Sequence, residues 1–135
     1  NGEKFLANHD KRHELKAVII SKIYNFDITA NWVYSSGSLY TDLKNMYVEA
    51  GSGFNIIILE NQNGKRLPSI HHMDISLSKK VKIYSKVVDV GLSIYNIYNR
   101  KNVSHKRYNP FSQNLLVTNV PMFGITPNAF FKISF

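Results

Sequence analysis

The sequence contains no cysteine, which excludes a disulfide framework and a thiolate metal site in this chain of 135 residues. It also lacks any apolar run approaching the roughly 20 residues that a membrane-spanning helix requires. Charged residues are sparse, at 19% against 44% hydrophobic, and this balance excludes intrinsic disorder, which depends on low hydrophobicity and high charge. What remains is a chain rich in tyrosine and phenylalanine and long enough to form one domain.

Sequence motifs for catalysis are missing as well. There is no nucleophile motif, phosphate-binding loop or glycine-rich dinucleotide turn, and the acidic residues show no pairing suited to general acid–base chemistry. His71 and His72 are adjacent, so on a strand they point to opposite faces and cannot hold one ion together. His72 and Asp74 share a face and suit a hydrogen-bonded pair. We predict no enzymatic activity, no cofactor and no metal site.

The formal net charge is +8, with 17 lysines and arginines against 9 acidic residues. Such a balance suits nucleic acid or an anionic lipid surface. The positive residues are scattered over short groups, however: DKRHELK, NGKR, SKKVK, NRKN and HKR. Because no group is long enough to form a basic arm, we interpret them as parts of loops and solvated strand faces, and we predict no nucleic-acid partner.

Alternation of apolar and polar residues with a period of two dominates the chain, which is typical of β-strands. The predicted strands are residues 12–24, 27–36, 69–83, 87–99 and 114–135. Their apolar faces include Leu15, Ile28, Met73, Val90 and Phe131. We predict an all-β fold in which these strands form an antiparallel meander.

The predicted connections differ in length in a regular way. Short turns are expected at 25–27 and 84–86, whereas long polar segments cover 1–11, 37–67 and 100–113. All the long connections then lie at one end of the sheet, as in transmembrane β-barrels with short periplasmic turns and long external loops. Within the middle loop we expect a short helix near 41–50 and a strand at 56–59.

The strand lengths and faces also suit a membrane. The predicted strands exceed the roughly five or six residues typical of soluble sheets and reach the roughly nine to eleven that a membrane strand needs. Lipid would cover the apolar face, although a soluble sheet with one buried face alternates in the same way. Aromatic residues near the strand ends fit interfacial belts, namely Trp32, Tyr34, Tyr95 and Tyr98. The alternation fails between Ile94 and Tyr98, which predicts a bulge near Tyr95.

Particular stretches of the chain resemble a known family. A strand ending in phenylalanine, PNAFFKISF, resembles the C-terminal signal read by the outer-membrane barrel-assembly machinery, with Phe131, Ile133 and Phe135 as its residues. Together with RHELKAVIISKI, WVYSSGSLYT, RLPSIHHMDISLSKKV and GLSIYNIYNRKN in that order, the whole chain resembles the C-terminal end of a TonB-dependent outer-membrane receptor of the Bacteroidetes type. Met73-Asp74 replaces the commoner Leu-Asp of the family, and His72 stands where arginine is frequent.

The resemblance implies a barrel of about 22 strands, located in the bacterial outer membrane and closed by an N-terminal plug. Such a receptor imports a scarce nutrient (a siderophore, cofactor or glycan) with energy from the TonB complex. This chain would supply the last five strands, and the rest of the barrel and the plug would lie upstream. Five strands cannot close a barrel, whose smallest common size is about eight. We therefore expect 1–135 to be a partial segment and not an autonomous domain.

The expected partners are the remaining barrel and plug, the TonB complex through the plug, the barrel-assembly machinery, and membrane lipid or lipopolysaccharide. Ligand contacts are expected from the external loops, at Tyr40, Tyr47, Arg66, Arg100, Arg107 and Tyr108. Two other classes of protein remain open at this point. One is a small, complete outer-membrane β-barrel of structural or adhesin type, and the other is a soluble lipocalin-like or β-sandwich binding module.

Overall fold

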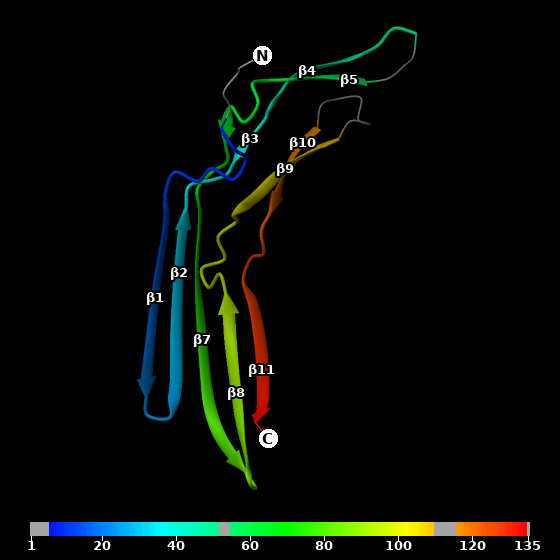
Figure 1. Cartoon of the computed structure of the whole chain (residues 1–135). Helices are drawn as coiled ribbons and strands as arrows, with labels where there is room; N and C mark the ends of the chain where they lie inside the picture. Colours follow the sequence, from blue (N-terminus) through cyan, green and yellow to red (C-terminus); the bar gives the residue numbers. More distant parts are fainter. Residues whose placement is uncertain (1–5, 52–54, 110–115, 135) are drawn as a thin grey trace.

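One open antiparallel sheet organises the molecule. The computed structural model describes residues 6–51, 55–109 and 116–134, and these form β-strands and no helix. Five strands pair in the order β1-β2-β7-β8-β11, which we call the main sheet (Figure 1). Its strands are β1 (Glu14–Ile23), β2 (Phe26–Ser35), β7 (Ile70–Ile83), β8 (Lys86–Tyr95) and β11 (Thr126–Ser134). The prediction of an all-β, antiparallel fold is confirmed, and the strands follow one another in chain order.

Three two-stranded ladders lie beyond one end of the main sheet (Figure 1). They pair β3 (Leu39–Tyr40) with β6 (Lys65–Arg66), β4 (Leu43–Val48) with β5 (Asn55–Leu59), and β9 (Val103–Asn109) with β10 (Leu116–Pro121). We call this the ladder end, and the opposite end of the main sheet the short-turn end. The predicted long segments 37–67 and 100–113 therefore contain paired strands where the sequence suggested loops.

The predicted helix near 41–50 is wrong. Residues Leu43–Val48 form β4, which pairs with the apolar run of β5, so that Met46 lies opposite Ile57 and Tyr47 opposite Ile56. An isolated helix of about ten residues is marginal in water, whereas the ladder satisfies the same backbone groups and packs β-branched side chains. The strand expected at 56–59 is confirmed as part of β5.

The last predicted strand, 114–135, divides in two, which corrects the sequence prediction. Its first part is β10, which pairs with β9, and its second part is β11, which pairs with β8. Pro121 lies at the end of β10, where the register with β9 shifts. Proline has no backbone N–H to donate to a ladder, so regular pairing ends there. Residues 114, 115 and 135 of the prediction lie outside the described residues.

Both short connections are two-residue turns, Tyr24-Asn25 and Tyr84-Ser85, because Ile23 pairs with Phe26 and Ile83 with Lys86. The first lies one residue earlier than expected, and the second lies within the expected 84–86. Tyr24 and Tyr84 both adopt a φ of 53°. Positive φ is what a tight hairpin between twisted strands requires, but it is rare for a bulky side chain.

The register aligns the apolar positions of all five strands. One row across the main sheet contains Phe26, Lys79, Val90 and Phe131 side by side. Another row contains Ala17, Trp32 and Met73. Since successive side chains alternate, the residues predicted to be apolar on each strand lie on one common side. We call this side the apolar face and the other side the polar face.

The irregularity expected near Tyr95 lies at its neighbour. β8 ends at Tyr95, and Asn96 has a φ of 51°. The amide of Ile97 then donates to the carbonyl of Met73 (2.8 Å), so the chain returns to β7 after an added residue. Asparagine tolerates the left-handed region better than most residues, which explains why the break in alternation falls there.

The described part of the chain has almost no enclosed core. Its buried apolar residues are Leu39, Leu67 and Val88. The chain exposes 10392 Å², whereas a compact monomer of 15.5 kDa exposes about 7,200 Å². The difference reflects a single sheet whose two faces lie open.

Candidate functional site

The apolar face is the largest exposed feature of the main sheet. No described residue outside the main sheet forms a second layer over it, and Phe131 (73% exposed) and Leu92 (62%) project from it into open space. Contiguous apolar patches larger than a few hundred Å² mark protein, membrane or ligand contacts. The face comprises Leu15, Ala17, Ile19, Ile23, Phe26, Ile28, Ala30, Trp32, Tyr34, Met73, Ile75, Leu77, Val81, Ile83, Val88, Val90, Leu92, Ile94, Ala129, Phe131 and Ile133.

The predicted interfacial aromatics separate into two groups. Trp32 and Tyr34 share the apolar face at the ladder end, with ring centroids 6.3 Å apart and near-parallel planes. Tyr98 joins them indirectly, since its hydroxyl lies 2.9 Å from Nδ1 of His71 on the same face. Tyr95 instead lies on the polar face, where its ring contacts His72 at 4.7 Å between centroids. The structure therefore brings Trp32, Tyr34 and Tyr98 to one face and leaves Tyr95 on the other.

Asp74 organises the polar face. Its Oδ1 lies 2.9 Å from Nδ1 of His72 and accepts the amide of Asn96 at 3.0 Å, while its Oδ2 accepts from Asn31 Nδ2 at 3.3 Å. The predicted His72–Asp74 pair is confirmed. Among the described residues, no three histidine, aspartate or glutamate side chains converge as an ion site would require.

Two of the three predicted loop arginines, Arg66 and Arg100, make hydrogen bonds within the chain. Arg66 donates from one guanidinium nitrogen to the carbonyls of Asp10 and Gly37, both at 2.7 Å, and pairs with the Asp10 carboxylate at 3.2 Å. Arg100 donates to Asn102 Oδ1 at 3.1 Å and to the Ser69 carbonyl at 3.3 Å. These hydrogen bonds hold the surrounding loops against the ladder end of the main sheet.

Two buried asparagines complete this junction, and no sequence pattern indicated them. Asn96 donates to the carbonyls of Arg100 (2.9 Å) and Phe123 (3.2 Å) and accepts the Arg100 amide (3.1 Å). Asn102 donates to the His71 carbonyl (2.9 Å) and accepts the His71 amide (3.2 Å). Each side chain bonds to backbone groups, as a neighbouring strand would, where the regular strand pairing is interrupted. In the sequence they are two asparagines among several in NIYNRKN, with no periodicity to single them out.

A polar groove of about 350 Å³ opens among the ladders. Tyr40, Lys106 and Tyr108 contribute to its wall, and Asn8 and His105 also line it. The Lys106 ammonium lies 4.3 Å from the centroid of the Tyr40 ring, and hydrogen bonding to Tyr40 raises the pKa of Lys106. The Tyr108 hydroxyl donates to the Thr41 carbonyl at 2.9 Å, and burial raises the pKa of Tyr108.

The groove contains two of the six predicted ligand residues, Tyr40 and Tyr108. Tyr47 lies on β4 and Arg107 on β9, and both are exposed outside the groove. Lys106 belongs to the loop from which contacts were expected but was not among the six residues chosen, although a cation two residues before a tyrosine on the same strand shares its face. Tyrosine faces, a fixed ammonium and amide groups together suit a polar or anionic small molecule.

A network of charges braces the ladders beside this groove. The Lys65 ammonium lies 2.8 Å from Asp42 Oδ2 and 3.1 Å from Glu60 Oε2. Hydrogen bonding to Asp42 raises the pKa of Lys65 above its ordinary range, and the same bond lowers the pKa of Asp42. Because the Lys65 ammonium is exposed to solvent, each pair contributes little to stability.

The predicted barrel-assembly residues are partly described. Phe131 and Ile133 lie on the apolar face of β11, the last strand of the main sheet, where the prediction placed them. Phe135 lies outside the described residues. The edge position of β11 leaves one side of it without a neighbouring strand among the described residues.

No protein-family model matches the chain, and no curated protein or solved structure is similar to it. The described residues contain no helix that is long and apolar enough to cross a membrane. The proposed function therefore rests on the two faces of the main sheet, its two-residue turns and the ladders.

Proposed function

We propose that the chain is the C-terminal β-barrel segment of a TonB-dependent outer-membrane receptor, which imports a scarce nutrient. The observation that carries the proposal is the apolar face. It extends across five strands whose long connections all lie at one end and whose two-residue turns lie at the other. This is the arrangement of a membrane barrel wall.

Energetics favour a covering layer over the apolar face. Burying one large apolar side chain stabilises a protein by about 1.5–3 kcal/mol, and this face presents more than a dozen such side chains. Lipid would cover it without any further protein layer. The polar face, with Asp74, His72 and a series of hydroxyl and lysine side chains, suits the water-filled interior of a barrel.

The dimensions support the same proposal. On β2, the apolar face extends from Phe26 to Tyr34, a span within the roughly nine to eleven residues that a tilted membrane strand requires. Trp32 and Tyr34 lie at its ladder end, where a belt of amphipathic rings would meet the outer headgroups. The ladders and their groove would then lie outside the membrane, where a nutrient would be captured.

The two edge strands support a larger barrel. β1 and β11 each have one side without a strand partner among the described residues. Exposed edges of this length promote aggregation unless another strand pairs with them. In the proposed receptor, upstream strands of the same polypeptide would complete the barrel at both edges.

The direct test is the location and folding of the complete natural polypeptide. We expect it in the outer-membrane fraction, with a gel mobility that changes on heating, as a closed barrel unfolds only when boiled. Import of a labelled nutrient should depend on the TonB complex. A monodisperse, cooperatively folding soluble protein would contradict the proposal and favour a soluble binding module instead.

A further inference from the structure

The apolar face carries two lysines, and both lie at the short-turn end. Lys79 pairs in register with Phe26, next to the first turn, and Lys86 follows the second turn directly. Every other residue of the apolar face between these turns and Trp32 is uncharged. A lysine facing lipid is far more costly at the bilayer midplane than near the interface. Positions near the headgroups therefore suit both lysines.

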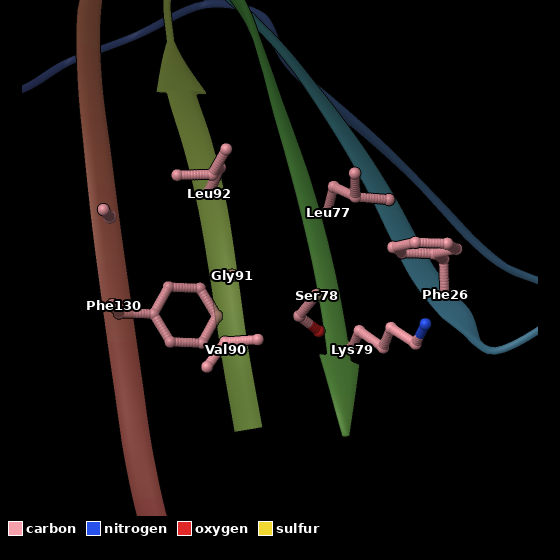
Figure 2. A pocket seen from close by; sticks show the side chains of 9 residues that line it. Phe26, Leu77, Ser78, Lys79, Val90, Gly91, Leu92 and Phe130 are labelled. Atoms are coloured by element: carbon pink, nitrogen blue, oxygen red, sulfur yellow. The ribbon is translucent and has the colours of Figure 1, made fainter. Parts of the chain in front are cut away.

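Each lysine lies at the rim of an apolar hollow. The first hollow, of about 380 Å³, is lined by Phe26, Leu77, Lys79, Val90 and Leu92 among others (Figure 2). Figure 2 shows these side chains on neighbouring strands, with the Phe130 ring reaching toward β8 at Gly91. The Lys79 ammonium lies 4.9 Å from the centroid of the Phe26 ring, so its stem follows the apolar surface while its charge stays at the edge.

The second hollow, of about 480 Å³, lies against the turn of β7 and β8. Ile83, Val88, Phe131 and Ile133 form its apolar wall, and Lys86 and Tyr84 also line it. An apolar hollow with one cation at its rim matches an amphiphile that has a hydrocarbon chain and an anionic headgroup. A zwitterionic lipid would bring a second positive charge close to the same ammonium.

The turns themselves add polar anchors at this level. Tyr24 and Tyr84 are 93% and 96% exposed, and both hold a strained φ of 53° that glycine or asparagine would adopt more readily. The same motif, Lys-Ile-Tyr followed by a small polar residue, occurs at both turns: KIYN and KIYS. A phenol held outward at the tip of each turn can donate a hydrogen bond to a phosphate.

The two rim lysines have the sign of charge that such a ligand requires. A lysine near a membrane surface attracts anionic lipid by about 1 kcal/mol, which is about fivefold in affinity.

We infer that the short-turn end of the apolar face binds anionic phospholipid at each of the two hollows, with an acyl chain in the hollow and the phosphate beside the lysine at its rim, Lys79 or Lys86. The inference rests on the proposed membrane function and goes beyond it, because an outer-membrane barrel has no general need for a preferred headgroup. It assigns the lipid to the leaflet at the short turns and leaves the groove at the ladder end for a different ligand.

The test uses the complete natural protein, purified in detergent and titrated with phosphatidylglycerol or with phosphatidylcholine of the same chain length. Bound lipid is counted by native mass spectrometry. We expect phosphatidylglycerol to bind preferentially to the wild type. The K79A and K86A variants should each lose about fivefold of this preference, the factor that corresponds to one lysine at an anionic surface.

The matched control is K101A, which removes one positive charge at the ladder end and should keep the full preference. K79R should also keep it, because the charge remains. Heat-dependent gel mobility checks that every variant is folded. Equal binding of both lipids by a folded, membrane-inserted wild type would overturn this inference and leave the proposed function standing. Failure of the complete protein to enter membranes of either composition would overturn both.

Discussion

The main sheet and the ladder end follow different rules. In the main sheet, five strands keep one register and one alternation from the turns to Trp32, and stability depends on what covers a face. At the ladder end, single side chains hold the chain in place. Arg66 and Asn102 each make two hydrogen bonds, and Asn96 and Arg100 one each, to residues 27 to 56 positions away. The main sheet therefore depends on a periodic sequence pattern. The ladder end, which is proposed to capture a ligand, depends on specific polar contacts.

The largest effect is expected from a charge placed in the middle of the apolar face. Ile75→Arg on β7 should destabilise the complete, membrane-inserted protein by about 2–4 kcal/mol, because arginine would face the hydrocarbon core. Ser76→Arg, one residue away on the polar face, should cost far less. Urea unfolding in lipid vesicles measures both. Equal losses for the two variants would show that the faces do not differ in environment.

An effect of similar size is expected at the junction between the two regions. Asn96→Ala removes three hydrogen bonds from a fully buried side chain and places alanine at a φ of 51°. Leaving buried partners unsatisfied costs about 1–3 kcal/mol, and a left-handed residue adds about 1–2. Asn96→Gly removes the bonds without the backbone strain and should therefore cost less than Asn96→Ala. An identical loss for both variants would argue against the strained conformation.

A smaller effect is expected inside the main sheet at Gly91. A Cβ there would lie 2.4 Å from Phe130 Cζ and 2.9 Å from the Leu77 carbonyl oxygen. Gly91→Ala should destabilise the protein by about 1–3 kcal/mol through this overpacking. Combining it with Phe130→Ala should recover part of the loss, since the ring is the nearer obstacle. Additive losses in the double variant would contradict the proposed clash.

The smallest effect is the pH response of the ladder end. The pKa of Asp42 is lowered in the folded protein by its bond to Lys65, so the stabilisation is fully present above the unfolded value, about 3.9. It is lost as the pH falls through the lowered folded value. Because the pair is exposed, the change should stay below about 1 kcal/mol. The protection factors of the β4 and β5 amides, which correct for the intrinsic exchange rate at each pH, should fall in that acidic range, and Lys65→Gln should abolish the fall.

The contrast between the regions also explains what the sequence could predict. The faces of all five main-sheet strands followed from a period of two, because one side of each strand is apolar whatever covers it. The His72–Asp74 pair followed from the same spacing. Strict alternation also placed Tyr95 on the polar face, where it lies, although its aromatic character suggested a belt residue.

The ladder end was predicted poorly for a physical reason. β4 carries mixed polar and apolar residues, and only its pairing with the isoleucines of β5 makes it a strand. The roles of Asn96 and Asn102 depend on backbone groups of Phe123 and His71, which are about 30 residues away in the chain. No local pattern encodes such contacts. Within the groove, Tyr40 and Tyr108 were found as exposed loop aromatics, whereas Lys106 needed the geometry.

The most direct test of the account is a spin-label scan along β7 in the complete protein, reconstituted in lipid vesicles. The chain has no cysteine of its own, so single cysteines can be placed at each position from His72 to Ser78. We predict that collisions with oxygen, which concentrates in lipid, peak at Met73, Ile75 and Leu77, while collisions with a water-soluble nickel complex peak at the residues between them. Access of the nickel complex to Met73, Ile75 and Leu77, or protection of all positions from both reagents, would contradict a lipid-facing sheet.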